Sequence, residues 1–157
     1  MENAKLEMAK SALEFAQAVE HLCLEAEWCN AVTAQFLTGL LSREGLERAA
    51  YVAWAPVVTR KRGVQNREIW AVSASACAAI FAVAAACAED EDTAMEHAKD
   101  AASASALAAI SDDKWEAEWA TIADERPPVA DAMGEAIEAL EARCAETIRR
   151  YLPALAV

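Results

Sequence analysis

The sequence predicts an all-α protein, a single-domain helical bundle of about six helices with a central alanine-rich buried helix. Its 157 residues are about the length of one ordinary domain. The hydrophobic content of 56% is enough to build one core, and Ala is its largest contributor. Only four Gly and four Pro are present, too few for the many turns of a β-sandwich or barrel. We therefore predict one all-α domain over residues 1–157.

The first element is predicted from a heptad-like seam of apolar and small side chains. These recur at alternating four- and three-residue spacing, with Met8 and Leu40 at the two ends, which indicates one long helix. Asn30 is the expected kink or break, because its side chain competes for backbone hydrogen bonds. We interpret the seam as a core face. The alternative is a homodimer contact through the Met8–Leu40 helix.

Proline, glycine and a cationic run place the next two elements. A second helix is predicted over 46–55, because Pro56 disfavours helical dihedrals in the residue before it. A loop over 59–66 follows, with three consecutive cations at 60–62. Asn66 is placed to cap a third helix, which continues to residue 88.

The third helix contains 18 uncharged residues, 71–88, and must be tested as a membrane span. Its length and its flanking charges fit a transmembrane helix. However, ten of the 18 residues are Ala and two are Ser, so the helix gains little from contact with lipid. Small residues on every side instead let other helices approach closely. We predict a buried helix of a soluble bundle and no membrane partner.

Two capping boxes predict the helices that follow the acidic residues 89–92. Thr93 with Glu96 begins a fourth helix over 94–110. Asp113 with Glu116 begins a short fifth helix.

The last helix is predicted from its proline start and its apolar stripe. Pro127 and Pro128 interrupt the chain, and proline is favoured in the first turn of a helix. Apolar residues then recur at helical spacing over 129–151.

Cysteine usage and the N-terminus indicate the compartment. Five cysteines occur, without any C-x-x-C pair, and each lies among Ala, Leu or Trp, so we predict buried free thiols. The first ten residues, MENAKLEMAK, have no apolar core of a signal peptide. A reducing, cytoplasmic location is therefore expected.

Catalytic signatures are sparse in the sequence. The two histidines, His21 and His97, each follow a Glu directly, whereas a di-iron bundle needs Glu and His three residues apart. We expect His97 to be a solvated helix residue. The four glycines are isolated, so no phosphate-binding loop is indicated. We predict no catalytic residue, no metal and no other cofactor.

Two acidic patterns are similar to metal-binding motifs. The run from Asp112 to Glu116 matches D-D-x-x-E, which we interpret as acidic charge at a helix N-terminus. Asp92, Glu96 and Asp100 lie at four-residue spacing, with Glu89 before them, as in all-α nucleotide pyrophosphatases. A metal-dependent nucleotide phosphohydrolase is therefore an alternative function.

Charge is concentrated in one segment of the chain. Residues 71–125 carry 12 acidic and two basic side chains, which is −10 of the total formal charge of −12. This acidity excludes a general nucleic-acid binder, and it fits a cationic groove on another protein. Trp115 and Trp119 add aromatic anchors beside the charges. The predicted partner-binding residues are Glu89, Asp90, Glu91, Asp92, Asp112, Asp113, Glu116, Glu118, Trp115 and Trp119.

Two stretches of the chain show a compositional resemblance to a known class. The alanine-rich run 70–110, with short acidic breaks, and the ending 142–153 resemble the alanine-dominated helical chains of bacterial and phage immunity proteins. The resemblance carries over no functional residue. It implies a non-catalytic protein that binds and neutralises another protein.

We therefore predict an acidic inhibitor of the immunity, antitoxin-like or anti-defence type. It would occlude a basic site on a partner protein, of the kind that takes nucleic acid. A further alternative is a structural helical subunit of a larger complex. In that case the seam pairs helices, and the cations Arg60, Lys61 and Arg62 touch an acidic neighbour or RNA.

Overall fold

The computed structural model describes residues 3–60, 67–120 and 128–152, and side chains there except for 67, 111–120 and 128–131. The predicted all-α fold is confirmed, because the described residues form helices and no strand. The elements are α1 (Asn3–Gln17), a 3₁₀ turn η1 (Glu20–Leu22), α2 (Leu24–Leu37), α3 (Arg43–Val58), α4 (Arg67–Cys87), α5 (Glu91–Ala120) and α6 (Pro128–Tyr151).

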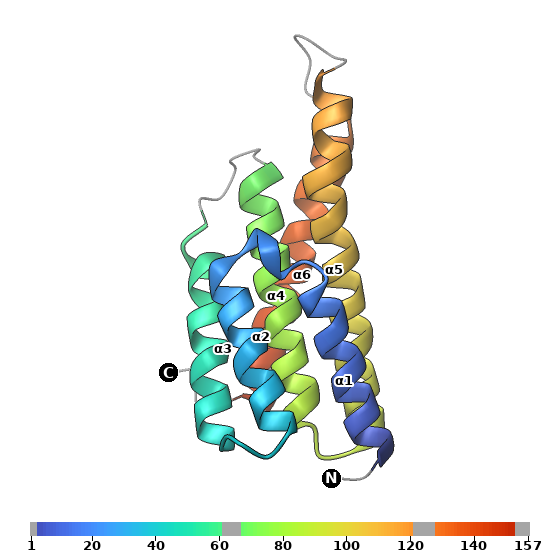
Figure 1. Cartoon of the computed structure of the whole chain (residues 1–157). Coiled ribbons are helices and arrows are strands. Elements are labelled where there is room, and N and C mark those ends of the chain that lie inside the picture. Colours follow the sequence, from blue (N-terminus) through green and yellow to red (C-terminus); the bar gives the residue numbers. More distant parts are fainter. Residues whose placement is uncertain (1–2, 61–66, 121–127, 153–157) are drawn as a thin grey trace.

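The centre of the bundle is α4, which contacts each of the other five α-helices (Figure 1). From residue 70 to residue 86 every side chain of α4 is buried except the half-buried Val72. Alanine on all faces permits this, because a helix without large side chains can be approached closely from every direction. The predicted central alanine-rich helix is therefore confirmed.

The same helix is the one candidate for a membrane span within the described residues. Residues Glu68–Cys87 have a mean hydropathy of 2.0, but 89% of the tested stretch is buried inside the bundle. The core helix of a soluble protein has this property, and the burial agrees with the prediction made from composition.

The prediction of one long first helix is wrong, because the chain breaks between α1 and α2. Asn30, the expected break, is instead buried within α2, and its Nδ2 donates a hydrogen bond to Oε2 of Glu20 in η1 at 3.0 Å. On the other side of the break, Ser75 Oγ of α4 donates to the carbonyl oxygen of Val19 at 2.8 Å. Asn30 thus stabilises the break from a position about two turns inside α2.

The seam residues belong mostly to the core of the chain itself. Ala12, Ala26, Cys29 and Thr33 are fully buried, and only Leu40 is strongly exposed among the last seam positions. The interpretation as a core face is confirmed for these positions. The homodimer stays a prediction, but no uninterrupted Met8–Leu40 helix exists to carry it.

The predicted bounds of α3 are wrong at both ends. The helix begins at Arg43, because Ser42 Oγ accepts a hydrogen bond from the N–H of Gly45 at 3.3 Å and so caps it. It continues through Pro56 to Val58. Pro56 lies in the last turn, where its missing N–H costs one helical bond, and burial of Val57 holds the chain in helical form.

The start of α5 and its length also differ from prediction. Asp90, and not Thr93, caps the helix: its Oδ1 accepts a hydrogen bond from the N–H of Thr93 at 2.7 Å. The helix then continues to Ala120, so the two helices predicted over 94–110 and from Asp113 are one. No Gly or Pro occurs between residues 91 and 120 to interrupt it. The predicted cap Asn66 lies outside the described residues.

Candidate functional site

The acidic tetrad 89–92 forms an exposed end of the bundle, at the turn from α4 to α5. This turn lies at the same end as the N-terminus (Figure 1). All four carboxylates are exposed. The turn is held in place by Lys5, whose Nζ donates to the carbonyl oxygen of Glu89 at 3.1 Å, and by the cap of Asp90. The tetrad is therefore a fixed feature of the surface.

Asp90 caps the N-terminus of α5, a structural role that Glu89, Glu91 and Asp92 do not have. The hydrogen bonds from Thr93, led by the backbone N–H, lower the pKa of the Asp90 carboxyl below its ordinary value. Its charge therefore also stabilises the start of α5. Glu89, Glu91 and Asp92 are the members of the tetrad whose charge can be removed without loss of the cap.

The second half of the predicted surface lies far from the tetrad. Asp112 is 20 residues beyond Asp92 on the same helix, which corresponds to roughly 30 Å along the helix axis. The side chains of Asp112, Asp113, Trp115, Glu116, Glu118 and Trp119 lie outside the described residues. The ten predicted residues therefore occupy two separate regions, one at the turn into α5 and its first turn and the other toward the C-terminal end of α5, and not one compact patch.

The carboxylates proposed for metal binding do not converge. Asp100 is buried and receives a hydrogen bond from Arg143 Nε of α6 at 2.6 Å, and Glu96 lies 3.8 Å from the same guanidinium. Two of the four proposed ligands, Glu96 and Asp100, are thus paired with Arg143. Within the described residues no group of three His, Cys, Asp or Glu is close enough to hold a metal ion.

His97 is a buried residue, and the expectation that it is solvated is wrong. It is 1% exposed, and its ring meets the ring of Tyr151 edge-to-face at a centroid distance of 4.6 Å. Neither ring nitrogen has a hydrogen-bond partner among the described residues. Burial lowers the pKa of His97, so the ring is held neutral.

A buried ion pair joins α6 to the end of α3, and sequence reasoning missed it. Arg60 donates to both oxygens of Glu141, at 2.7 Å and 2.6 Å, and both side chains are almost fully buried. Ser73 Oγ of α4 donates to Glu141 as well, at 2.6 Å. In the alternative of a structural subunit, Arg60 would touch an acidic neighbour or RNA; this is wrong for Arg60, because its guanidinium is buried against Glu141.

The sequence does contain a signal for this ion pair. Glu141 stands at four- and three-residue spacing between Ile137 and Cys144, inside the apolar stripe of α6. A charge at such a position is buried when the helix packs, so it requires a cation nearby. Lys61 and Arg62, the other two cations of the run, lie outside the described residues.

Comparison with known proteins gives no match. No protein-family model, no curated protein and no solved structure is significantly similar to this chain. The resemblance to immunity proteins therefore stays a prediction.

Proposed function

We propose that the chain is a non-catalytic binding protein that neutralises a partner protein by covering a basic site. The observation that supports this is the exposed acidic end: five acidic side chains occur within residues 89–96, and all five are exposed. We refer to Glu89, Asp90, Glu91, Asp92 and Glu96 as the acidic end. It would act by charge and shape, and it would require no cofactor.

The fold supplies the rigidity that such a role needs. The acidic end lies at the turn into α5 and on its first two turns, and α5 packs on the central α4 and on α1. Carboxylates held on a fixed frame present a directional negative field. That field raises the association rate with a cationic surface and disfavours partners of the same sign.

The partner we propose is a protein with a basic surface of the kind that binds nucleic acid. Occlusion of that surface would prevent nucleic acid from reaching it, as expected of an immunity, antitoxin-like or anti-defence inhibitor. The free thiols and the burial of the most apolar helix fit a cytoplasmic protein.

The experiment begins with partner capture on the immobilised chain from a nuclease-treated lysate of the native host. A captured protein is identified by mass spectrometry, and its affinity is then measured at several salt concentrations. The test variant is Glu89→Gln, Glu91→Gln and Asp92→Asn together, which leaves the cap of Asp90 intact. We expect weaker binding and a smaller dependence of the affinity on salt.

A control variant that loses the same number of charges elsewhere separates the effect of the acidic end on binding from the effect of the overall acidity of the chain. Glu7, Glu14 and Glu27 are exposed on α1 and α2, and their replacement by Gln removes the same three charges. We expect this control to bind as the wild type does. Equal affinity of the test variant and the wild type, or the absence of any retained protein, would refute the proposal.

A further inference from the structure

The acidic end borders a cavity of about 400 Å³, at the place where α3, α4, α5 and α6 meet. The described walls of this cavity come from the start of α3, the end of α4, the turn into α5, the first turn of α5 and the last turn of α6. Two residues of the acidic end, Glu89 and Asp90, belong to these walls. The cavity and the acidic end therefore form one continuous surface.

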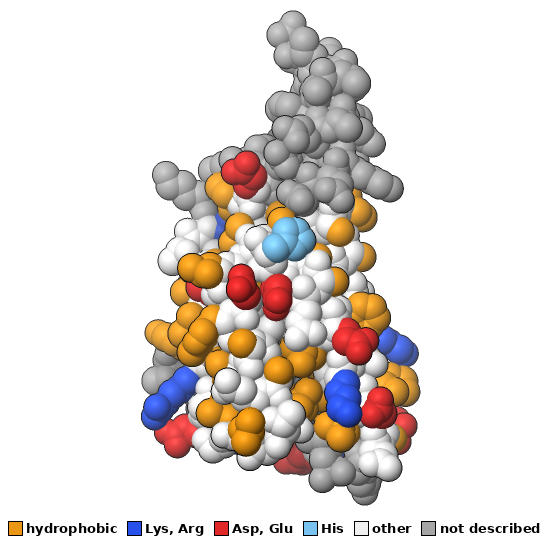
Figure 2. All heavy atoms as spheres, viewed as in Figure 1, with side chains coloured by type: hydrophobic (Ala, Val, Ile, Leu, Met, Phe, Trp, Pro, Cys, Tyr) orange, Lys and Arg blue, Asp and Glu red, His pale blue; other side chains and the backbone are white. Residues whose placement is uncertain are grey.

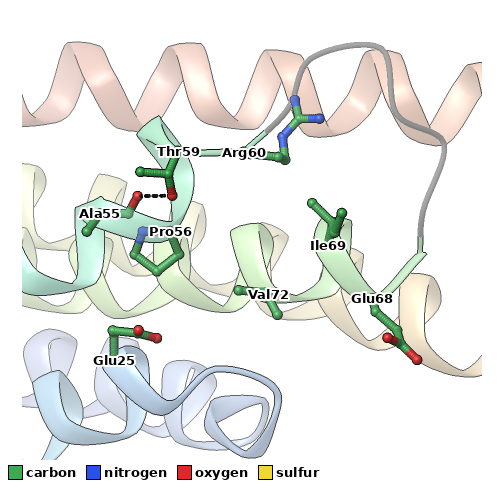
Figure 3. A pocket seen from close by; sticks show the side chains of 8 residues that line it. All are labelled: Glu25, Ala55, Pro56, Thr59, Arg60, Glu68, Ile69 and Val72. Carbon is green, nitrogen blue, oxygen red and sulfur yellow. Dashed lines mark hydrogen bonds between the residues drawn. The ribbon is translucent and has the colours of Figure 1, made fainter.

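A larger cavity of about 580 Å³ lies at the other end of α4, between α2, the end of α3 and the start of α4 (Figure 3). Its described walls include no residue of the acidic end. The 21 residues of α4 span roughly 30 Å between the two cavities. Residues 61–66, between its wall residues Arg60 and Glu68, lie outside the described residues, so we assign it no occupant.

The walls of the smaller cavity include small apolar groups and an aromatic ring. Ala84 and Ala88 supply methyl groups, and Tyr151 supplies a phenol ring. The ring of Tyr151 packs edge-to-face on the buried ring of His97, with 4.6 Å between the centroids. The guanidinium of Arg150 lies 5.2 Å from the centroid of the Tyr151 ring. The phenol ring and the guanidinium thus give the cavity a preformed stacking surface.

The charged groups of the walls have both signs. Arg43 and Arg150 line the cavity together with Glu89 and Asp90. Figure 2 likewise shows basic and acidic side chains around the lower end of the molecule, which carries the α4–α5 turn in Figure 1. A Lys or Arg inside the cavity would lie near guanidinium groups as well as carboxylates, so it gains little net attraction there. The cations of a partner are better placed on the rest of the acidic end, outside the cavity.

An aromatic side chain with a polar group fits these walls. Its ring can pack on the methyl groups and on the ring of Tyr151, and a guanidinium over the ring face adds a cation–π contact. The N–H of a Trp or the O–H of a Tyr can donate a hydrogen bond to the exposed carboxylate of Glu89. Such a side chain uses the apolar and the polar walls together, which an aliphatic side chain does not do.

Aromatic side chains and cations occur together where proteins bind single-stranded nucleic acid. The cations contact phosphates there, and the bases stack on the aromatic rings. The acidic end offers carboxylates in place of phosphates, and the cavity offers a stacking surface in place of a base. We propose that the basic partner is a protein that binds single-stranded nucleic acid, and that its base-stacking Trp or Tyr enters this cavity. This inference rests on the proposed function, to which it adds the class of partner and a second contact.

The test uses two fluorescently labelled peptides that carry the chemistry of such a groove. One is a lysine-rich peptide with one central Trp, and the other has Ala in place of the Trp. Fluorescence anisotropy in about 0.15 M salt, where longer-range charge effects are screened, gives the affinity of the full chain for each peptide. We expect the Trp peptide to bind about tenfold more tightly, as one interface anchor provides. Equal affinities would overturn the proposal, and so would binding of neither peptide.

Two matched pairs of variants locate the aromatic contact. Ala88→Leu places a larger side chain on the cavity wall, whereas Ala31→Leu adds the same side chain to the exposed surface of α2. Arg150→Met and Arg149→Met remove the same charge from neighbouring exposed positions, of which Arg150 lines the cavity. We expect the two cavity variants to reduce the affinity ratio of the Trp peptide to the Ala peptide toward one, and the two controls to retain it. Retention of the ratio in both cavity variants would overturn the proposal.

Circular dichroism must show that each variant melts as the wild type does. If Ala88→Leu does not fold, the comparison of Arg150→Met with Arg149→Met decides, since both positions are exposed.

A double variant separates this inference from the proposed function. Glu91→Gln with Asp92→Asn removes two exposed charges that do not line the cavity, so it should weaken both peptides equally and retain their affinity ratio. Unchanged affinities at a retained ratio would refute the acidic end and support the aromatic contact. Weaker binding of both peptides at a ratio of one would support the acidic end and overturn the aromatic contact.

The class of partner is tested with the protein captured on the chain. A single-stranded oligothymidylate should compete with the chain for this protein. A DNA duplex of equal length should compete much less, because its bases are stacked on one another and do not reach an aromatic side chain. Displacement by the duplex alone, or by neither nucleic acid, would overturn the assignment.

Discussion

Replacement of Glu141 by Gln should destabilise the protein more than any surface charge change. The carboxylate of Glu141 accepts two hydrogen bonds from Arg60 and one from Ser73, and its side chain is 3% exposed. Glu141→Gln leaves the Arg60 guanidinium buried without its counter-charge. Removal of one member of a buried pair costs about 3–5 kcal/mol. At about 2–4 °C per kcal/mol, the melting temperature should fall by roughly 6–20 °C.

Urea unfolding followed by circular dichroism at neutral pH measures this loss. Glu135→Gln is the matched control, because Glu135 is exposed on the same helix, and it should change the free energy of unfolding by less than about 0.5 kcal/mol. The double variant Arg60→Met with Glu141→Leu removes both charges and should recover most of the stability, since an apolar pair can replace a buried ion pair. The reasoning fails if Glu141→Gln costs no more than the control, or if the double variant is less stable than Glu141→Gln.

Three further predictions follow from burial and capping. Because burial lowers the pKa of His97, the unfolded chain binds a proton that the folded chain does not as the pH falls below about 6.5. Stability should therefore decline as the pH falls toward the folded pKa, and His97→Leu should flatten that decline in urea unfolding between about pH 7 and about pH 5.5; an unchanged slope would contradict it. Asp90→Ala should lower the melting temperature through loss of the α5 cap, whereas Asp90→Asn should retain most of it, because Asn also caps helices; equal melting temperatures of the two variants would show that the cap is unimportant. The five cysteines are free, four of them buried, and burial raises the pKa of Cys29 to about 12 and of Cys87 to about 11. Ellman's reagent should therefore react slowly with the folded protein and count five thiols after denaturation; rapid reaction of the folded protein would refute this.

Sequence periodicity predicted the helical class well, but it could not place the breaks. The apolar spacing of the seam over 8–40 continues through the α1–α2 break. Val19 before η1 and Ala26 after it are both buried in the core, so the apolar pattern does not reveal the break. The break depends on hydrogen bonds from Asn30 and Ser75 to residues distant in the chain, and local pattern does not contain such contacts. The capping signal was also misplaced. The sequence predicted Thr93 as the cap of the helix after the acidic residues, whereas the hydrogen bond from the N–H of Thr93 shows that Asp90 caps it.

The burial of polar side chains was the feature that sequence patterns predicted least well, because it depends on tertiary contacts. His97 lies beside the exposed Glu96 on a helix with little large apolar content, so its sequence neighbours suggest a solvated residue. It is buried because Tyr151, from the last turn of α6, packs against it. Arg60 similarly follows α3 in a cationic run, and Glu141 draws its side chain into the interior from 81 residues away.

By itself the sequence determined the all-helical class, the central alanine-rich helix and the acidic end that follows it. Helical periodicity, small side chains and charge runs are local properties, and each acts wherever the helix is placed. Tertiary structure alone decided that Asp100 and Arg60 are bound to partners and that Leu24, Trp28 and Tyr51 remain uncovered. Burial and charge pairing depend on which helix lies alongside, and that arrangement is set by the packing of all the helices together.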